Sequence, residues 1–246
     1  MARGNAGPEA LGPTMDGLTL TLVLGAAGVA LLHTAIGPDH YLPFVMLGRA
    51  RRWSLRRTLL VTGLCGLAHV ASSLLLGGLG ILAGVALGAI EDVEGGRGEV
   101  AAWALFWVGI AYALYGVRQA RRQGLTVHRH GRVVHVHADG QLPHEHASPA
   151  QGERTTFWAL FLVFVLGPCE PLIPLFALPA SEGNWSAALA AGAVFAIVTI
   201  ATMLAITAVM SAGASAVRLG SLERWSHALA GSVVAGSAGT VLFLGL

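Results

Sequence analysis

The sequence predicts an all-α polytopic membrane protein with six transmembrane helices, arranged as two inverted three-helix repeats whose first helices are broken. Three observations lead to this fold class. Hydrophobic residues make up 54% of the 246 residues and charged residues only 11%, whereas a soluble domain has about 25% charged residues. Six apolar segments approach or exceed the ~20 residues that a helix needs to cross a bilayer. A Gly-Pro pair interrupts the first segment of each half.

The apolar segments divide the chain into two halves of three. They cover about 17–36 (extendable to 48), 58–89, 100–117, 156–179, 185–210 and 226–246. We expect residues 1–16, which are rich in glycine and proline, to form a disordered extracytoplasmic tail. A polar motif rather than a cleavage site follows the first segment, so we expect that segment to remain in the mature protein. The predicted units are a first repeat over 17–119, a polar loop over 120–155 and a second repeat over 156–246.

The arginines predict the orientation of these spans. The chain has fifteen arginines and no lysine. Thirteen of the arginines follow the first, third and fifth spans, and only Arg3 and Arg97 fall on the other side. The positive-inside rule then places both termini outside and the arginine-rich loops in the cytoplasm. We therefore expect a multi-pass protein of the cell (inner) membrane, with the lipid bilayer as its partner and no nucleic acid.

The end of the first span carries His33, Asp39 and His40 at a depth where hydrocarbon is the solvent. Ionisable groups there cost several kcal/mol unless they are paired, so they indicate a functional site. Pro38 lacks an N–H group and Gly37 has the freest backbone, so a helix is expected to break between these residues. In a membrane such a break is tolerated where it lines a cavity enclosed by protein.

The fourth span contains a corresponding Gly-Pro motif, Gly167-Pro168-Cys169-Glu170-Pro171. Because three is an odd number of spans, the second half is inverted relative to the first, so the two breaks are expected to meet near the midplane. His69, on the second span, is expected nearby. Imidazole ligands suit nickel, cobalt, zinc and copper(II). The candidate metal ligands are therefore His33, Asp39, His40, His69, Cys169 and Glu170.

The loop over 120–155 contains three His-x-His pairs. In extended backbone, residues i and i+2 point to the same side, so that each pair can bind one metal ion. Histidine-rich tracts of this kind indicate metal binding, and the arginines place this loop in the cytoplasm. The candidate residues of this metal-binding loop are His128, His130, His135, His137, His144 and His146.

The first motif, His33-x5-Asp39-His40 with Gly37-Pro38 inside it, resembles the first-helix signature of the nickel/cobalt transporter superfamily. The nearest likeness is to the UreH-type urease accessory permeases, and the Gly-Pro-Cys-Glu-Pro motif also resembles the second-half motif of that group. The best-known nickel permeases have four residues, not five, between the first histidine and the aspartate. The resemblance covers about 17–246. It implies transport of Ni²⁺ or Co²⁺, with His33, Asp39 and His40 as the binding set.

We therefore expect a permease rather than an enzyme, with no prosthetic group, working by alternating access around the intramembrane site. A cytoplasmic metallochaperone is a candidate partner. A histidine-rich loop occurs in importers and exporters of the superfamily, so it does not fix the direction of transport.

Two other functions compete with metal transport. Cys65 and Cys169 lie within spans and could form a transmembrane thiol–disulfide reductant carrier. A small-anion exporter, for sulfite as an example, could bind its substrate at half-helix N-termini, although Asp39 and Glu170 would repel that substrate.

Overall fold

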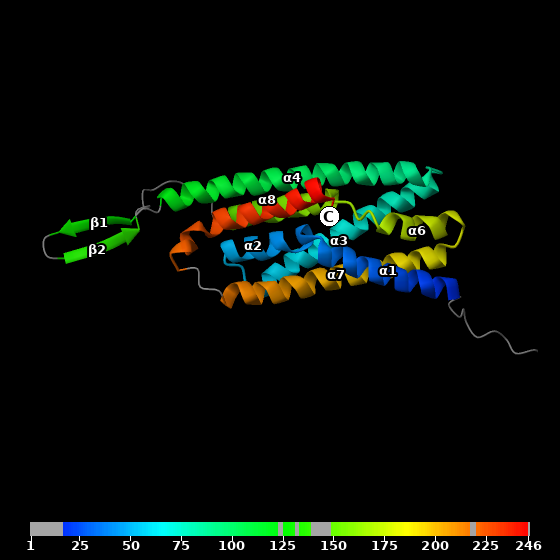
Figure 1. Ribbon diagram of the computed structural model, residues 1–246, viewed down its shortest axis with the longest axis horizontal. Helices are drawn as coiled ribbons and strands as arrows, with labels where there is room; N and C mark the ends of the chain where they lie inside the picture. Colours follow the sequence, from blue (N-terminus) through cyan, green and yellow to red (C-terminus); the bar gives the residue numbers. More distant parts are fainter. Residues whose placement is uncertain (1–16, 123–124, 131–132, 139–148, 217–219, 246) are drawn as a thin grey trace, which may run out of the picture.

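The computed structural model describes residues 17–122, 125–130, 133–138, 149–216 and 220–245. Within these residues the chain is a bundle of helices that lie along one common long axis, with a single two-stranded hairpin at one end (Figure 1). The helices and strands are α1 (Gly17–Ile36), η1 (Pro38–His40), α2 (Leu42–Ala50), α3 (Leu55–Leu82), α4 (Leu87–Arg122), β1 (Leu125–His130), β2 (Val133–Ala138), α5 (Pro149–Leu166), α6 (Leu172–Ser181), α7 (Trp185–Ala216), η2 (Gly220–Trp225) and α8 (Ser226–Leu244).

Five helices in the described part of the chain are long and apolar enough to cross a membrane. These candidate spans are Thr19–Ile36, Leu55–Leu82, Leu87–Arg121, Trp185–Ala214 and Glu223–Leu244. The apolar segment predicted over 156–179 is divided instead into two shorter helices, α5 and α6, by the Gly-Pro motif. The helical, membrane-type architecture predicted from composition is thus confirmed.

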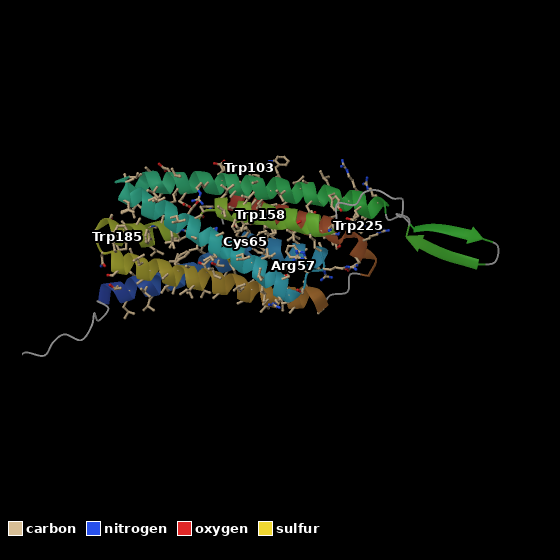
Figure 2. The ribbon with its side chains drawn as sticks, turned by 180° about the vertical axis from the view of Figure 1, so that it is seen from behind. Arg57, Cys65, Trp103, Trp158, Trp185 and Trp225 are labelled. Carbon is tan, nitrogen blue, oxygen red and sulfur yellow. The ribbon has the colours of Figure 1, made fainter. Side chains whose placement is uncertain are left out.

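The outer surface of the bundle carries large apolar side chains, as the lipid-facing surface of a membrane protein requires. Leu24, Ile197 and Val209 are all more than half exposed. Trp185 and Trp225 lie toward opposite ends of the bundle (Figure 2), where the amphipathic ring of tryptophan favours the two membrane interfaces.

The boundary between α3 and α4 differs from the prediction. The apolar segments predicted over 58–89 and 100–117 leave residues 90–99 between them as a connection, but α4 already begins at Leu87. The connection is short because Gly84, at φ +71°, adopts a left-handed conformation that ends α3 at no steric cost. As a result Glu94 and Arg97 belong to a helix, and Glu94 is completely buried.

Close backbone contact joins α4 to α8. A Cβ atom placed on Gly231 would lie 2.2 Å from the backbone nitrogen of Ala113, and one on Gly116 would lie 2.1 Å from that of Ala228. Small residues allow this approach, which is typical of helix packing in membranes. Helix α3 packs along α7, α1 also packs against α7, and α5 packs against α3.

The two short helices that follow the Gly-Pro motifs lie inside the bundle. Six of the nine residues of α2 are buried, among them Phe44, and α2 packs against α7 and α8. Six of the ten residues of α6 are buried, among them Phe176, and α6 packs against α3 and α7. The two breaks therefore lie at the centre of the bundle rather than on its surface.

Candidate metal centre

The first helix breaks where the sequence predicts. The Gly37 N–H donates to the carbonyl of His33 at 3.0 Å and ends α1. Pro38 supplies no N–H for the carbonyl of Thr34, so the helical hydrogen-bond ladder stops here. The hydroxyl of Tyr41 donates to the carbonyl of Ala35 at 3.3 Å and so replaces one donor that the helix would have supplied. One 3₁₀ turn then carries His40 into the interior of the bundle.

Three imidazole rings meet beside this break. The ring centroids of His33 and His40 are 4.8 Å apart, and those of His40 and His69 are 5.4 Å apart. His40 and His69 are each only 4% exposed. Within the described residues, the buried Nε2 atoms of His33 and His40 and both ring nitrogens of His69 have no hydrogen-bond partner. A buried polar atom without a partner costs about 1–3 kcal/mol, so these ring nitrogens are costly to bury unless a ligand binds them.

The other ring nitrogen of His40 fixes the tautomer of that ring. Its Nδ1 lies 3.1 Å from Oδ1 of Asp39 and 3.2 Å from the carbonyl oxygen of Gly37. An ionised carboxylate and a carbonyl oxygen can only accept hydrogen bonds, so Nδ1 carries the proton. The Nε2 atom of the neutral ring then keeps its lone pair and is free to bind a metal ion. A carboxylate behind a histidine in this way is the usual support of a histidine ligand.

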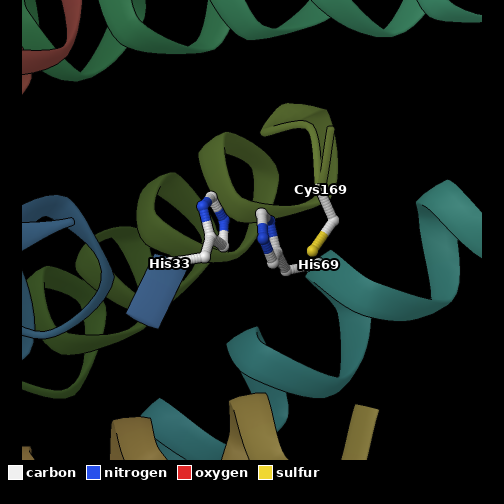
Figure 3. A group of neighbouring side chains, drawn as sticks. All are labelled: His33, His69 and Cys169. Atoms are coloured by element: carbon white, nitrogen blue, oxygen red, sulfur yellow. The ribbon is translucent and has the colours of Figure 1, made fainter. Parts of the chain in front are cut away.

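Cys169 brings the second break to the same cluster. One donor atom each from His33, His69 and Cys169 lie within 4.8 Å of one another. Figure 3 shows the rings of His33 and His69 side by side, with the Cys169 side chain directed toward His69. The three residues come from α1, α3 and the segment between α5 and α6, so distant parts of the sequence build this group. Imidazole and thiol donors are the set that first-row transition metals prefer.

A buried polar network holds the second break in place. The Cys169 N–H donates to Oγ of Ser73 at 3.0 Å instead of to the carbonyl of Val165. Arg97 supplies the missing donor, with its Nη2 atom 2.7 Å from the Val165 oxygen. Ser73 in turn donates to the carboxylate of Glu94 at 3.1 Å, and Glu94 forms an ion pair with Arg97. The network ties α3 and α4 of the first half to the break in the second half.

A cavity of about 570 Å³ opens beside the cluster and is lined by residues from both breaks. The carboxylates of Asp39, Glu99 and Glu170 all lie on its wall. Helix α4 approaches the second break closely at Gly98, where a Cβ atom would lie 2.5 Å from Cγ of Pro168. The cavity therefore combines acidic side chains with access to the buried imidazoles.

The predicted residues differ in where the structure places them. His33, His69 and Cys169 form the tight group, the ring of His40 contacts those of His33 and His69, and Asp39 contacts His40. Glu170 lines the cavity outside the tight group. In the loop, the strand register pairs position His128 with His135, and His130 and His137 also lie in the two strands; His144 and His146 fall outside the described residues.

Cys65 lies away from the tight group of donors. It is buried in an apolar cluster with Phe44, Phe164 and Met203, which is the packing role expected of a buried thiol.

Sequence reasoning missed the role of Glu94, Arg97 and Ser73. The i,i+3 spacing of Glu94 and Arg97 and the serines that follow His69 were the available signals. These three residues could have been found by extending the third predicted span, 100–117, toward the N-terminus through the acidic stretch.

No family model matches this chain, and neither a curated protein nor a solved structure matches it. The resemblance of its two motifs to those of the nickel/cobalt transporters therefore rests on the motifs themselves.

Proposed function

We propose that this protein is a membrane permease for a divalent transition-metal ion, with nickel or cobalt as its cargo. The observation that carries the proposal is that His33, His40 and His69 each bury a ring nitrogen that has no hydrogen-bond partner among the described residues. A neutral imidazole has one lone pair, so a bound cation would accept one from each of the three rings and so offset the cost of burying these nitrogens. An apolar core would not place three such rings together where two helices are broken.

The donor set favours a borderline metal ion. His33, His40 and His69 supply imidazole nitrogens, and Cys169 adds a sulfur atom close to two of them. Imidazole suits nickel, cobalt, zinc and copper(II), whereas Mg²⁺ and Ca²⁺ prefer oxygen ligands. In this proposal Asp39 orients His40 through Nδ1 and does not need to bind the ion itself.

The helix packing supports an inverted-repeat design. If α5 and α6 together form a sixth span, each half consists of one broken helix and two continuous helices. The corresponding continuous helices then pack on each other, α3 on α7 and α4 on α8, and the contact of α1 with α7 matches that of α5 with α3. A pseudo-twofold relation would produce this pattern. Rocking of one half against the other around a central site is the mechanism such designs use.

The negative charge of the cavity wall favours a metal cation over a small anion as the transported ion. Asp39, Glu99 and Glu170 line the route to the histidines and would raise the local concentration of a divalent ion. A sulfite-type anion would be repelled by the same groups. The reductant-carrier alternative is less well supported, because Cys65 and Cys169 are both free and belong to different apolar clusters.

Flux of Ni²⁺ into proteoliposomes that contain a metal-sensitive dye tests the proposal. We expect saturable uptake by the native protein and a loss of about tenfold or more in the His33→Ala and His69→Ala variants. His227→Ala is the matched control, since this histidine lies in α8 and is hydrogen-bonded to the hydroxyl of Tyr112 at 2.7 Å. Uptake that is absent in the native protein, or unchanged in both site variants, would overturn the proposal.

A further inference from the structure

A second cavity, of about 430 Å³, lies between α2, α4, α5 and α8. Most of its wall is apolar, and the side chains that form it come from all four helices. They include Leu47, Leu105, Val108, Leu160, Val163 and Val234. A cavity of this kind cannot hold a hydrated ion favourably, because it offers few polar atoms to replace the water.

The cavity is open on the side of the bundle. Two residues of its wall, Val108 and Tyr115, are 40% and 55% exposed on the outer surface of α4. Helix α4 is one of the candidate membrane spans. In a bilayer this opening would face hydrocarbon chains, so the molecules that reach the cavity first are lipids.

A positive charge lies on the wall of this apolar cavity. Arg51, which follows α2 directly, lines it, and its guanidinium carbon lies 5.6 Å from the centre of the Tyr112 ring. Tyr112 is itself held by its hydrogen bond to His227. The guanidinium group is thus positioned by its neighbours, and the planar guanidinium fork is well suited to bind a phosphate.

We infer that this cavity binds an anionic phospholipid, with one acyl chain between α4 and α5 and the phosphate beside Arg51. The apolar wall matches the chain, and the charge of Arg51 matches the headgroup. Residues of the arginine-rich segment that follows α2 lie where the positive-inside rule expects the cytoplasmic headgroups. The inference concerns lipid binding only and does not depend on the proposed transport of metal.

The bound chain would lie directly behind the wall of the candidate metal centre. Leu105 and Val163 line both this cavity and the histidine-lined cavity. Leu105 is buried and packs with Val163, Val234 and Ala238 into one apolar cluster. An acyl chain bound in the second cavity would therefore support Leu105 and Val163, the residues that the two cavities share.

Native mass spectrometry of the purified full-length protein in detergent tests the inference. The probes are phosphatidylglycerol and phosphatidylcholine with identical acyl chains; the choline cation of the second lipid neutralises the phosphate that Arg51 would bind. We expect the native protein to retain one phosphatidylglycerol at least about fivefold better than phosphatidylcholine, a preference that corresponds to about 1 kcal/mol. In Arg51→Gln the preference should disappear. The matched control is Arg56→Gln, which removes an exposed arginine of the same segment that does not line the cavity.

Filling the cavity distinguishes lipid binding inside it from nonspecific attraction of anionic lipids to surface arginines. Ala111 and Ala159 both line it, and a tryptophan at either position would occupy the space of the chain. Ala111→Trp or Ala159→Trp should reduce retention of both lipids, while each variant keeps the elution volume of the native protein. Equal losses in Arg51→Gln and Arg56→Gln, or full retention in the well-folded tryptophan variants, would overturn the inference.

Discussion

The Nδ1 atom of His40 lies 3.1 Å from the carboxylate of Asp39, and this contact determines which nitrogen of the ring can bind a metal ion. With Nδ1 protonated, Nε2 is left unprotonated and unpartnered within the described residues. The preceding Gly-Pro break brings the two side chains together, since the 3₁₀ turn places His40 in the interior directly after Asp39. The contact is thus a consequence of the local sequence.

Removing the charge of Asp39 should weaken metal binding without abolishing it. Asp39→Asn keeps the size of the side chain but makes a weaker hydrogen-bond acceptor for Nδ1. Supporting groups of this kind are worth about 10- to 100-fold in metal affinity. Isothermal titration with Ni²⁺ should therefore show a loss in that range, smaller than the loss caused by His40→Ala. Equal affinity for Asp39→Asn and the native protein would contradict the assigned role.

Acidification should reduce metal binding. An imidazole must be unprotonated to bind a metal ion, and the pKa of a free imidazole is about 6.5. As the pH falls, protons compete for the lone pairs of His33, His40 and His69, so the affinity for Ni²⁺ should decrease and never increase. Titrations with Ni²⁺ between about pH 7.5 and pH 5.5 measure this dependence. A higher affinity at the acidic end would show that the ligands are not histidines.

The close approach of α4 and α8 should be sensitive to side-chain size at Gly231. A side chain there would meet the backbone of α4, since a Cβ atom would lie 2.2 Å from the nitrogen of Ala113. Overpacking of this kind costs about 1–3 kcal/mol or more, so Gly231→Leu should lower the melting temperature in detergent. Gly236→Leu is the control, because a Cβ on Gly236 has no atom of the described residues within 4 Å. Equal melting temperatures for both variants would contradict the packing described.

The effects of substitutions at Glu94 and Arg97 on the free energy of unfolding should be strongly coupled. Glu94 is fully buried, so Arg97→Gln leaves a buried carboxylate without its counter-charge, which costs about 3–5 kcal/mol. The double variant Glu94→Gln, Arg97→Gln should recover part of that loss. Denaturant unfolding in micelles measures both free energies, with the exposed Glu91→Gln as a control. Strictly additive losses would show that the two side chains do not interact.

The breaks could be predicted from the sequence because proline acts locally. In Gly37-Pro38 and Gly167-Pro168 the proline lacks the N–H that a helix needs, and the glycine before it favours a non-helical backbone. The start of α4 could not be predicted in the same way. The acidic stretch at Glu91 and Glu94 has the composition of a loop, and only the contacts of Glu94 with Ser73 and Arg97 make a helical, buried position tolerable.

The candidate site was predictable in its residues but not in its arrangement. A histidine within an apolar segment is costly to bury, so His33, His40 and His69 could be singled out from the sequence. That Cys169 approaches His33 and His69, while Glu170 remains on the cavity wall, depends on how α3 packs against α5. Such long-range packing leaves no periodic signal in the sequence. The distinction between Asp39 as a ligand and Asp39 as the support of His40 likewise required the 3.1 Å contact.

Anomalous scattering from crystals soaked in NiCl₂ would locate a transition-metal ion bound by the buried histidines. The six loop histidines are first replaced by alanine, so that the loop cannot account for the signal. We expect an anomalous peak enclosed by His33, His40 and His69, at about 2.1 Å from an imidazole nitrogen. Nickel found only at the protein surface, with no peak among these three rings, would contradict this expectation.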